Sequence, residues 1–314
     1  MSANPSLGLT AFRSEQQTLA GPAVFAGVGL HTGQRVRAAI LPAPADTGIL
    51  FLRTDVEGEG RIEARAENVT STRLSTVIGN AHGVTVATVE HLMAALYGLG
   101  VDNALVELDG PEAPIMDGSA EPFVRLIDRT GRRDQDAPRQ AIEILRPIEI
   151  IEGDKRAALV PSRRFEVAVE IAFDSPAIGR QRLDVAVDEH AFRTVLAGCR
   201  TFGFLHEVEA LRAAGLAQGG SLENAIVVDG DSVLNPEGLK HPDEFVRHKA
   251  VDAIGDLATL GRPLIGRYEG RFAGHALNNA LARALLAQPD AWRLTPLAAP
   301  VQAARAARRP GAFA

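Results

Sequence analysis

His248, Asp252 and Asp256 place an imidazole and two carboxylates at intervals of four residues. A helix advances about 100° per residue, so these side chains would rise along one helical face. A neutral imidazole and a carboxylate one turn apart can chelate a divalent ion, and zinc accepts that nitrogen and oxygen pair. The same spacing also fits an ion pair on a solvated helix, so a third ligand from elsewhere must decide.

The surrounding residues predict a helix from His241 to Leu260. Pro242 suits a first helical position, and Glu244 complements the positive end of the helix dipole. Gly261 and Pro263 would end the helix. We expect one flank to pack on a core and the other to face something polar. The apolar flank consists of Val246, Ala250, Ala253, Leu257 and Leu260.

Glu90 and His91 lie together at the start of a second predicted helix. Thr88 is a good N-cap residue, apolar residues follow at helical spacing, and Gly98 would end the helix. His91 could supply the third metal ligand while Glu90 reaches the water, because adjacent helical residues point about 100° apart. The alternative is an acidic residue that favours a helix start beside a histidine without a role.

His31 lies in a glycine-rich stretch from Gly27 to Gly33. Glycine lets a backbone approach a ligand closely, so His31 could line a site. From this stretch alone, a turn histidine without a role is the favoured interpretation.

The length of 314 residues suggests about two domains, each large enough to bury its own core. The expected boundaries are residues 1–133 and 139–290, followed by a loose tail at 291–314. The polar segment from Gly131 to Arg139 is predicted to be a linker. Each half runs from a histidine-bearing helix through a strand to a further helix start. This likeness predicts two similar α+β halves with a site between them.

The remaining predicted elements are short. Residues 10–52 alternate apolar stretches with turn residues, and Ser119 is expected to cap a helix. The predicted strands cover residues 61–79, 103–108, 141–151, 156–160, 165–173, 225–228 and 262–272, and the predicted helices cover 120–128, 207–214 and 274–288.

The composition excludes several classes of protein. A net charge of -6 and a pI near 5.8 argue against sequence-independent nucleic-acid binding, which needs a basic face. The single cysteine, Cys199, excludes an internal disulfide and a thiolate-rich zinc cluster. The N-terminus lacks the basic start and apolar stretch of a signal peptide, and no apolar run approaches the ~20 residues of a membrane span. We therefore expect a cytoplasmic protein without a transmembrane segment.

Several stretches carry a more specific signal when they are taken in order. They are Gly27 to Gly33, Thr88 to Leu92, Pro114 to Ala120, Arg200 to Phe204, Phe245 to Leu257 and Gly274 to Asn279. In these stretches the chain resembles the UDP-3-O-acyl-N-acetylglucosamine deacetylase family, zinc enzymes of the committed step of lipid A synthesis. The resemblance extends from about Thr18 to Gln288, which is nearly the whole chain.

The resemblance implies two domains of similar topology, each a β-sheet layered against paired α-helices, with the active site between them. The implied substrate is a UDP-linked acylated amino sugar, UDP-3-O-[(3R)-3-hydroxyacyl]-N-acetylglucosamine. Its N-acetyl group would be hydrolysed to the free amine and acetate. One zinc ion is the implied cofactor, although iron(II) could fill the same ligands in the cell. We expect a monomer.

The resemblance also assigns roles by motif position. The implied zinc ligands are His91, His248 and Asp252, which leave a fourth position to water. Glu90 would be the general base, and Thr201 and His275, the latter held by Asp256, would act at the scissile amide. The implied substrate-binding residues are Lys249, Phe202, Phe204, His31, Leu74, Gly220, Lys155 and Phe173. Residues from about 203 to 226 would form an acyl passage, although a plain insert with its own small core has the same composition.

Amide hydrolysis needs an activated water and a protonated leaving amine. Zinc would lower the pKa of bound water from about 16 toward 7 and polarise the carbonyl. The carboxylate of Asp256 should raise the pKa of His275 more than the nearby helix start lowers it. The sequence leaves open whether Glu90 moves both protons or shares them with His275.

Two other classes compete with this interpretation. A zinc peptidase lacks support, because the two histidines lie on different predicted helices and no H-E-x-x-H string occurs. A non-catalytic binding module with a structural zinc would normally close its site with four protein ligands. The open position and the adjacent Glu90 favour an enzyme.

Overall fold

The computed structural model describes residues 13–297 as a mixed arrangement of sheets and helices. The strands of the first half are β1 (Glu15–Leu19), β2 (Ala23–Val28), β3 (Arg35–Pro42), β4 (Ile49–Arg53), β5 (Arg61–Glu63), β6 (Val69–Ser71), β7 (Val77–Gly79), β8 (Thr85–Val86), β9 (Ala104–Leu108) and β10 (Arg132–Pro138). Its helices are a short 3-10 helix (Ala66–Asn68), α1 (Glu90–Gly98) and α2 (Glu121–Thr130).

The second half continues the alternation of strands and helices. Its strands are β11 (Gln140–Ile144), β12 (Ile148–Glu152), β13 (Lys155–Val160), β14 (Phe165–Ala172), β15 (Arg180–Ala186), β16 (Phe202–Phe204), β17 (Ile226–Asp229), β18 (Ser232–Val233), β19 (Leu264–Arg271) and β20 (Trp292–Pro296). Its helices are α3 (Glu189–Ala191), a π-helical turn (Phe192–Leu196), α4 (Leu205–Ala213), α5 (Glu244–Ala258) and α6 (His275–Leu286).

Two sheets repeat one pairing pattern. The first has the order β2-β3-β9-β4-β5, and the second contains β12-β13-β19-β14-β15 together with β11 and β20. In both, the third strand pairs antiparallel with the second and parallel with the fourth. The helices repeat as well, because α1 and α2 flank β9 in the chain as α5 and α6 flank β19. The mixed α+β fold predicted from the sequence is therefore confirmed, and the two halves share a topology.

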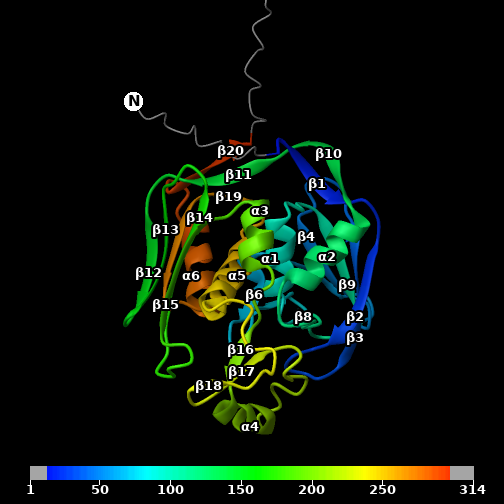
Figure 1. The fold of residues 1–314 in the computed structure, drawn as a ribbon. Helices are drawn as coiled ribbons and strands as arrows, with labels where there is room; N and C mark the ends of the chain where they lie inside the picture. The colour runs from blue at the N-terminus through cyan, green and yellow to red at the C-terminus, as the bar shows by residue number, and fades with distance from the viewer. Residues whose placement is uncertain (1–12, 298–314) are drawn as a thin grey trace, which may run out of the picture.

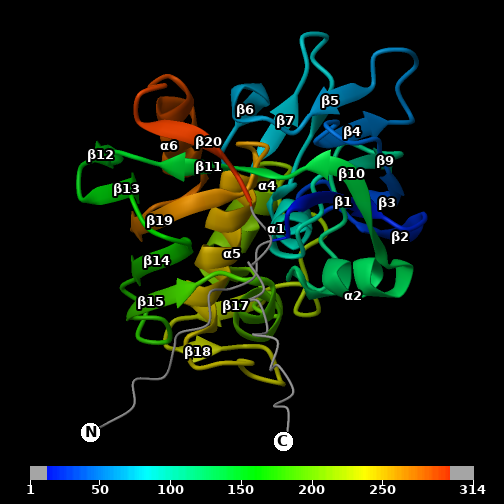
Figure 2. The same cartoon turned by 90° about the horizontal axis from the view of Figure 1, so that it is seen from above.

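The helices lie between the two sheets. Figure 1 shows β2, β3 and β9 on one side, β12 to β15 on the other, and α1, α5 and α6 between them. In Figure 2, β10 lies beside β1 near the first sheet and β11 lies beside β19 in the second. Strands β14 and β19 alternate between buried and partly exposed residues, as expected of strands that cover a core with one face.

The core is continuous across the two halves. Buried apolar residues from both sheets and from α1, α5 and α6 form one contiguous cluster, so the halves share a core instead of enclosing two separate ones. Helix α5 is buried on almost every side, with Arg247 and Lys249 as its only partly exposed residues. The flank that carries His248, Asp252 and Asp256 is buried too, and it faces other polar side chains, as the sequence predicted. Helices α1 and α6 and strands β14 and β15 contact α5, and α1 and α6 meet its polar flank through His91 at Asp252 and His275 at Asp256.

Two predicted helix starts are wrong. Thr88 does not cap α1: its φ of 57° lies in the left-handed region, and its hydroxyl donates to Glu112 Oε1 at 2.8 Å. The helix starts at Glu90 instead. Pro242 precedes α5, which starts at Glu244.

Two segments predicted to lack regular structure form strands. The expected linker from Gly131 to Arg139 contains β10, which pairs with β1. The expected tail at residues 291–314 begins with β20, which pairs with β11, because backbone pairing orders even polar residues at a sheet edge. The tail beyond Leu297, and the N-terminal residues 1–12, where the sequence indicated no signal peptide, lie outside the described residues. Within residues 13–297, no helix has the length and apolar character needed to cross a bilayer.

Candidate active site

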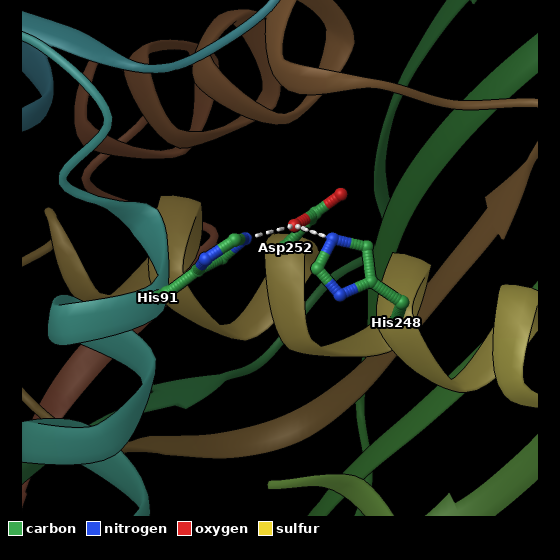
Figure 3. Close-up of side chains that lie close together, drawn as sticks. All are labelled: His91, His248 and Asp252. Atoms are coloured by element: carbon green, nitrogen blue, oxygen red, sulfur yellow. Dashed lines mark ion pairs between the residues drawn. The ribbon is translucent and has the colours of Figure 1, made fainter. Parts of the chain in front are cut away.

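Two helices bring three candidate metal ligands together. Helix α1 carries His91, and α5 carries His248 and Asp252 (Figure 3). Asp252 Oδ1 lies 3.5 Å from His91 Nε2 and 3.2 Å from His248 Nε2. One ligand atom from each residue lies within 4.8 Å of the others, and all three side chains are buried. The three predicted metal ligands, which come from two separate helices, therefore lie close together.

The donor set fits a divalent ion. Asp252 Oδ2 accepts a hydrogen bond from Lys249 Nζ at 2.9 Å, whereas Oδ1 has no hydrogen-bond partner among the described residues. His248 Nδ1 lies 3.0 Å from the carbonyl oxygen of Cys199, which directs Nε2 toward Asp252. Burial lowers the pKa of His91 and so favours the neutral imidazole that can bind a metal. Two imidazoles and one carboxylate suit zinc and leave a position for water.

A carboxylate and an imidazole face each other beside these ligands. Glu90 opens α1 and His275 opens α6, with 3.8 Å between Glu90 Oε1 and His275 Nε2. Burial raises the pKa of Glu90 to about 7. Burial alone would lower the pKa of His275, but the charge and hydrogen bond of Asp256 outweigh it and raise that pKa to about 9. The direction agrees with the sequence prediction, although the opposing influence is burial.

Asp256 is held by more residues than the sequence indicated. Its Oδ2 lies 2.9 Å from His275 Nδ1 and accepts from Asn278 Nδ2 at 2.8 Å. Its Oδ1 accepts from the hydroxyl of Thr76 at 2.5 Å. Asn278 Oδ1 in turn accepts from the hydroxyl of Tyr268 at 2.5 Å. Donors on every side fix the orientation of this buried carboxylate.

A cavity of about 310 Å³ opens beside the ligands. The predicted site residues that line it are His31, Leu74, Glu90, His91, Phe173, Thr201, Phe202, Phe204, Lys249, Asp252 and His275. His248 and Asp256 are buried next to them. The structure thus brings residues from most of the quoted stretches to one cavity.

Lys155 and Gly220 are not among the lining residues. Lys155 is exposed at the start of β13, where a tight hairpin pairs it with Glu152. Gly220 follows Gly219, whose backbone N–H donates to the Leu30 carbonyl oxygen at 3.0 Å, so this loop packs near the cavity wall. Substrate contacts by these two residues stay predictions.

The aromatic residues gather on one side of the cavity, next to the predicted passage. The ring of Phe173 lies 5.6 Å from that of Phe202 and 5.7 Å from that of Phe204. Lys249 Nζ lies 5.6 Å from the Phe202 ring centroid. Strands β16 to β18 and α4 form a separate small lobe at this end of the molecule (Figure 1). An apolar surface therefore adjoins the polar ligands.

Sequence reasoning missed several residues of the site. Leu30 and Thr88 also line the cavity, beside Gly203 and Glu207 of the predicted passage. Glu112 is fully buried, and its carboxylate accepts from the backbone N–H groups of His31 and Thr32 at 2.9 and 2.8 Å. This carboxylate therefore holds the glycine-rich loop of His31. Its position within the stretch from Asp109 to Gly118 was the only sequence signal.

An open set of two imidazoles and one carboxylate, beside a Glu–His pair in a cavity, defines the class of metal-dependent hydrolases. Residues 16–287 match the model of the UDP-3-O-acyl N-acetylglycosamine deacetylase family. The chain belongs to this family, as the resemblance in its motifs predicted.

Curated relatives named UDP-3-O-acyl-N-acetylglucosamine deacetylase agree with the family match. The protein from Phenylobacterium zucineum is 68% identical over 280 residues, which cover 89% of this chain and 96% of the relative. The relative from Acidithiobacillus ferrooxidans is 52% identical over 279 residues, covering 88% and 91%. The relative from Myxococcus xanthus is 50% identical over 281 residues, covering 90% and 89%. The similarity thus extends over nearly the full length of this chain and of each relative.

Proposed function

We propose that this protein is a zinc-dependent deacetylase of UDP-3-O-[(3R)-3-hydroxyacyl]-N-acetylglucosamine. It hydrolyses the N-acetyl group to the free amine and acetate, the committed step of lipid A biosynthesis. The observation that carries this proposal is the buried group of His91, His248 and Asp252 at the cavity that also holds Glu90 and His275. Membership of the deacetylase family supports the same reaction.

His91, His248 and Asp252 would hold one zinc ion. The unpartnered Oδ1 of Asp252 and the two imidazole nitrogens near it support this ligand set, which iron(II) could also use. When bound, zinc supplies Lewis acidity that polarises the acetyl carbonyl and acidifies a water molecule. Lys249 Nζ donates to the second oxygen of Asp252, so Oδ1 is the oxygen that would be left for the ion.

Glu90 acts as the general base. It accepts one proton from the attacking water, whose oxygen forms a bond to the acetyl carbon. A pKa of about 7 gives Glu90 a basicity suited to proton transfer near neutral pH. The carbon–nitrogen bond then breaks, and the departing amine needs a proton. His275 donates it from Nε2, because Asp256 keeps the imidazole charged.

The remaining cavity residues bind the substrate. The Thr201 hydroxyl donates to the carbonyl oxygen as negative charge develops there. Lys249, with its side chain over the Phe202 ring, meets sugar hydroxyls or phosphate. Phe202 and Phe204 contact the acyl chain on the apolar side of the cavity. Phe173, which the resemblance places near the diphosphate and uracil, packs against both rings.

The halves expected at 1–133 and 139–290 would act as two α+β units with the active site between them; they share one core, and β20 extends the second half to Pro296. Their identical strand pairing supports this division, and the ligands on α1 and α5 come from both halves. The monomeric state stays a prediction from the resemblance. The cytoplasmic location stays a prediction from the sequence.

A comparison of substrates tests the proposed function. The zinc-loaded protein should release acetate rapidly from the acylated UDP-sugar and much more slowly from UDP-N-acetylglucosamine, which lacks the acyl chain. N-acetylated peptides should release none. Turnover of the peptides without turnover of the sugar would assign the site to a peptidase-like amidohydrolase instead.

A further inference from the structure

Thr76 contacts both carboxylates that serve the proton-transfer pair. This residue is 2% exposed and directly precedes β7. Its backbone N–H donates to Glu90 Oε2 at 3.1 Å, and its hydroxyl donates to Asp256 Oδ1 at 2.5 Å. Its carbonyl oxygen accepts from the Val89 N–H at 3.4 Å, next to the start of α1. All of its polar groups are therefore engaged at the site.

We propose that Thr76 is a positioning residue that fixes Glu90 and the Asp256–His275 pair relative to each other. The proposal rests on the proposed function, in which Glu90 and His275 transfer protons. Thr76 itself lies behind these groups and is not among the residues that line the cavity. It therefore acts through them.

The geometry explains how one residue can set two side chains. The N–H bond of Thr76 occupies Glu90 Oε2 and leaves Oε1 on the side of His275 Nε2, 3.8 Å away. The Thr76 hydroxyl fixes one oxygen of Asp256 while the Asn278 amide fixes the other. With its plane fixed, Asp256 can hold the His275 ring in only one orientation through Nδ1.

Thr76 also joins the two halves of the molecule. Glu90 belongs to α1 in the first half, whereas Asp256 lies on α5 in the second, 180 positions from Thr76. Leu74, two residues before, has a φ of 67°, a left-handed conformation that bulky L-residues rarely adopt. Strained turns persist where their surroundings over-determine them, often at functional sites. This turn presents Leu74 to the cavity and Thr76 to the carboxylates.

Substitution of the hydroxyl tests the proposal. Thr76→Val keeps the side-chain shape and removes the donor, so kcat for acetate release should fall by about tenfold to a hundredfold with little change in KM. Thr76→Ser restores the donor and should recover most of kcat. Thr259→Val is the matched control: Thr259 is also buried, and its hydroxyl donates at 2.5 Å to the backbone carbonyl of Asp256 instead of the carboxylate. The control should keep kcat near the wild-type value.

Zinc content, thermal unfolding and the downfield proton resonance of His275 Nδ1 should be recorded for every variant. Thr76→Val should shift or broaden this resonance while zinc content stays unchanged. Wild-type kcat in Thr76→Val, or equal losses in Thr76→Val and Thr259→Val, would overturn the proposal. Thr76→Ala removes the same donor and replaces the valine variant if that variant does not fold. Failure of the wild type to release acetate counts against the proposed function alone, because the resonance still reports positioning.

Discussion

Gly255 lies directly against the backbone of Glu90. A Cβ atom at Gly255 would overlap the carbonyl oxygen of Glu90, so only glycine allows α1 and α5 to approach this closely. The contact lies between Asp252 and Asp256 on α5 and at the residue next to His91 on α1. The spacing of the metal ligands across the two helices therefore depends on Gly255 having no side chain.

Gly255→Ala should weaken zinc binding and lower thermal stability. Alanine favours a helix over glycine by about 1 kcal/mol, but overpacking typically costs about 1–3 kcal/mol and would push the helices apart. Zinc titration and thermal unfolding measure the two effects. Gly21→Ala is the control, because a Cβ atom there meets nothing within 4 Å. Unchanged zinc affinity in Gly255→Ala would show that the ligands tolerate a shift of the helices.

The Glu90→Gln variant should bind zinc like the wild type but should have almost no deacetylase activity. The amide has nearly the same shape as the carboxylate but cannot accept the proton of the attacking water, so kcat should fall by about 10²–10⁴-fold. Metal analysis of the purified variant should give the wild-type zinc content. Zinc loss in proportion to activity would instead make Glu90 a ligand.

The pH dependence separates the two schemes for proton transfer. A pKa of about 9 keeps His275 charged at neutral pH, and the imidazolium is lost as the pH rises through that value. If His275 is the acid, kcat falls as the pH rises through the pKa of His275. Bound zinc should move this basic limb of the pH profile to lower pH, because the positive ion repels the positive imidazolium. Asp256→Asn removes the carboxylate charge and should move the basic limb lower still. If the basic limb of Asp256→Asn stayed at the wild-type pH, Glu90 would have to carry out both proton transfers.

Metal removal should silence the protein without unfolding it. The shared apolar core does not depend on the ligands, so circular dichroism should change little after treatment with a chelator. Zinc should raise the unfolding temperature, because binding adds about 4 kcal/mol of stability when free zinc exceeds Kd about 1,000-fold. Asp252→Asn should reduce this rise, whereas Asp290→Asn, at an exposed ion pair with Arg146, should not. Unfolding by the chelator would indicate a structural zinc.

The sequence predicted the elements whose patterns are local. Helix α5 and strands β14 and β19 have clear periodicities, because one or more of their faces are buried, and their ends agree with the predictions within a few residues. Strand β10 was missed because all of its residues are partly or fully exposed, so the strand has no apolar alternation to detect. Threonine is a common N-cap residue, but the hydroxyl of Thr88 donates its hydrogen bond to Glu112 instead of capping α1.

The candidate site was predictable where short motifs carry several of its residues at once. His248 and Asp252 share one helical turn, and Glu90 and His91 are adjacent, so their chemistry is visible in the chain. Thr76 has no such neighbour, since its partner Asp256 lies 180 positions away in the chain and only the fold brings the two together. Long-range contacts of single polar residues leave no periodic pattern in the sequence. Contacts of this kind could be found only in the structure.

Acetate release by metal-stripped protein is the most direct test of the central claim. The stripped protein should be inactive toward the acylated UDP-sugar, and about one equivalent of zinc per chain should restore acetate release. The Asp252→Asn variant should not recover under the same conditions. Undiminished acetate release by the stripped protein, or none after zinc is restored, would contradict a zinc deacetylase built on His91, His248 and Asp252.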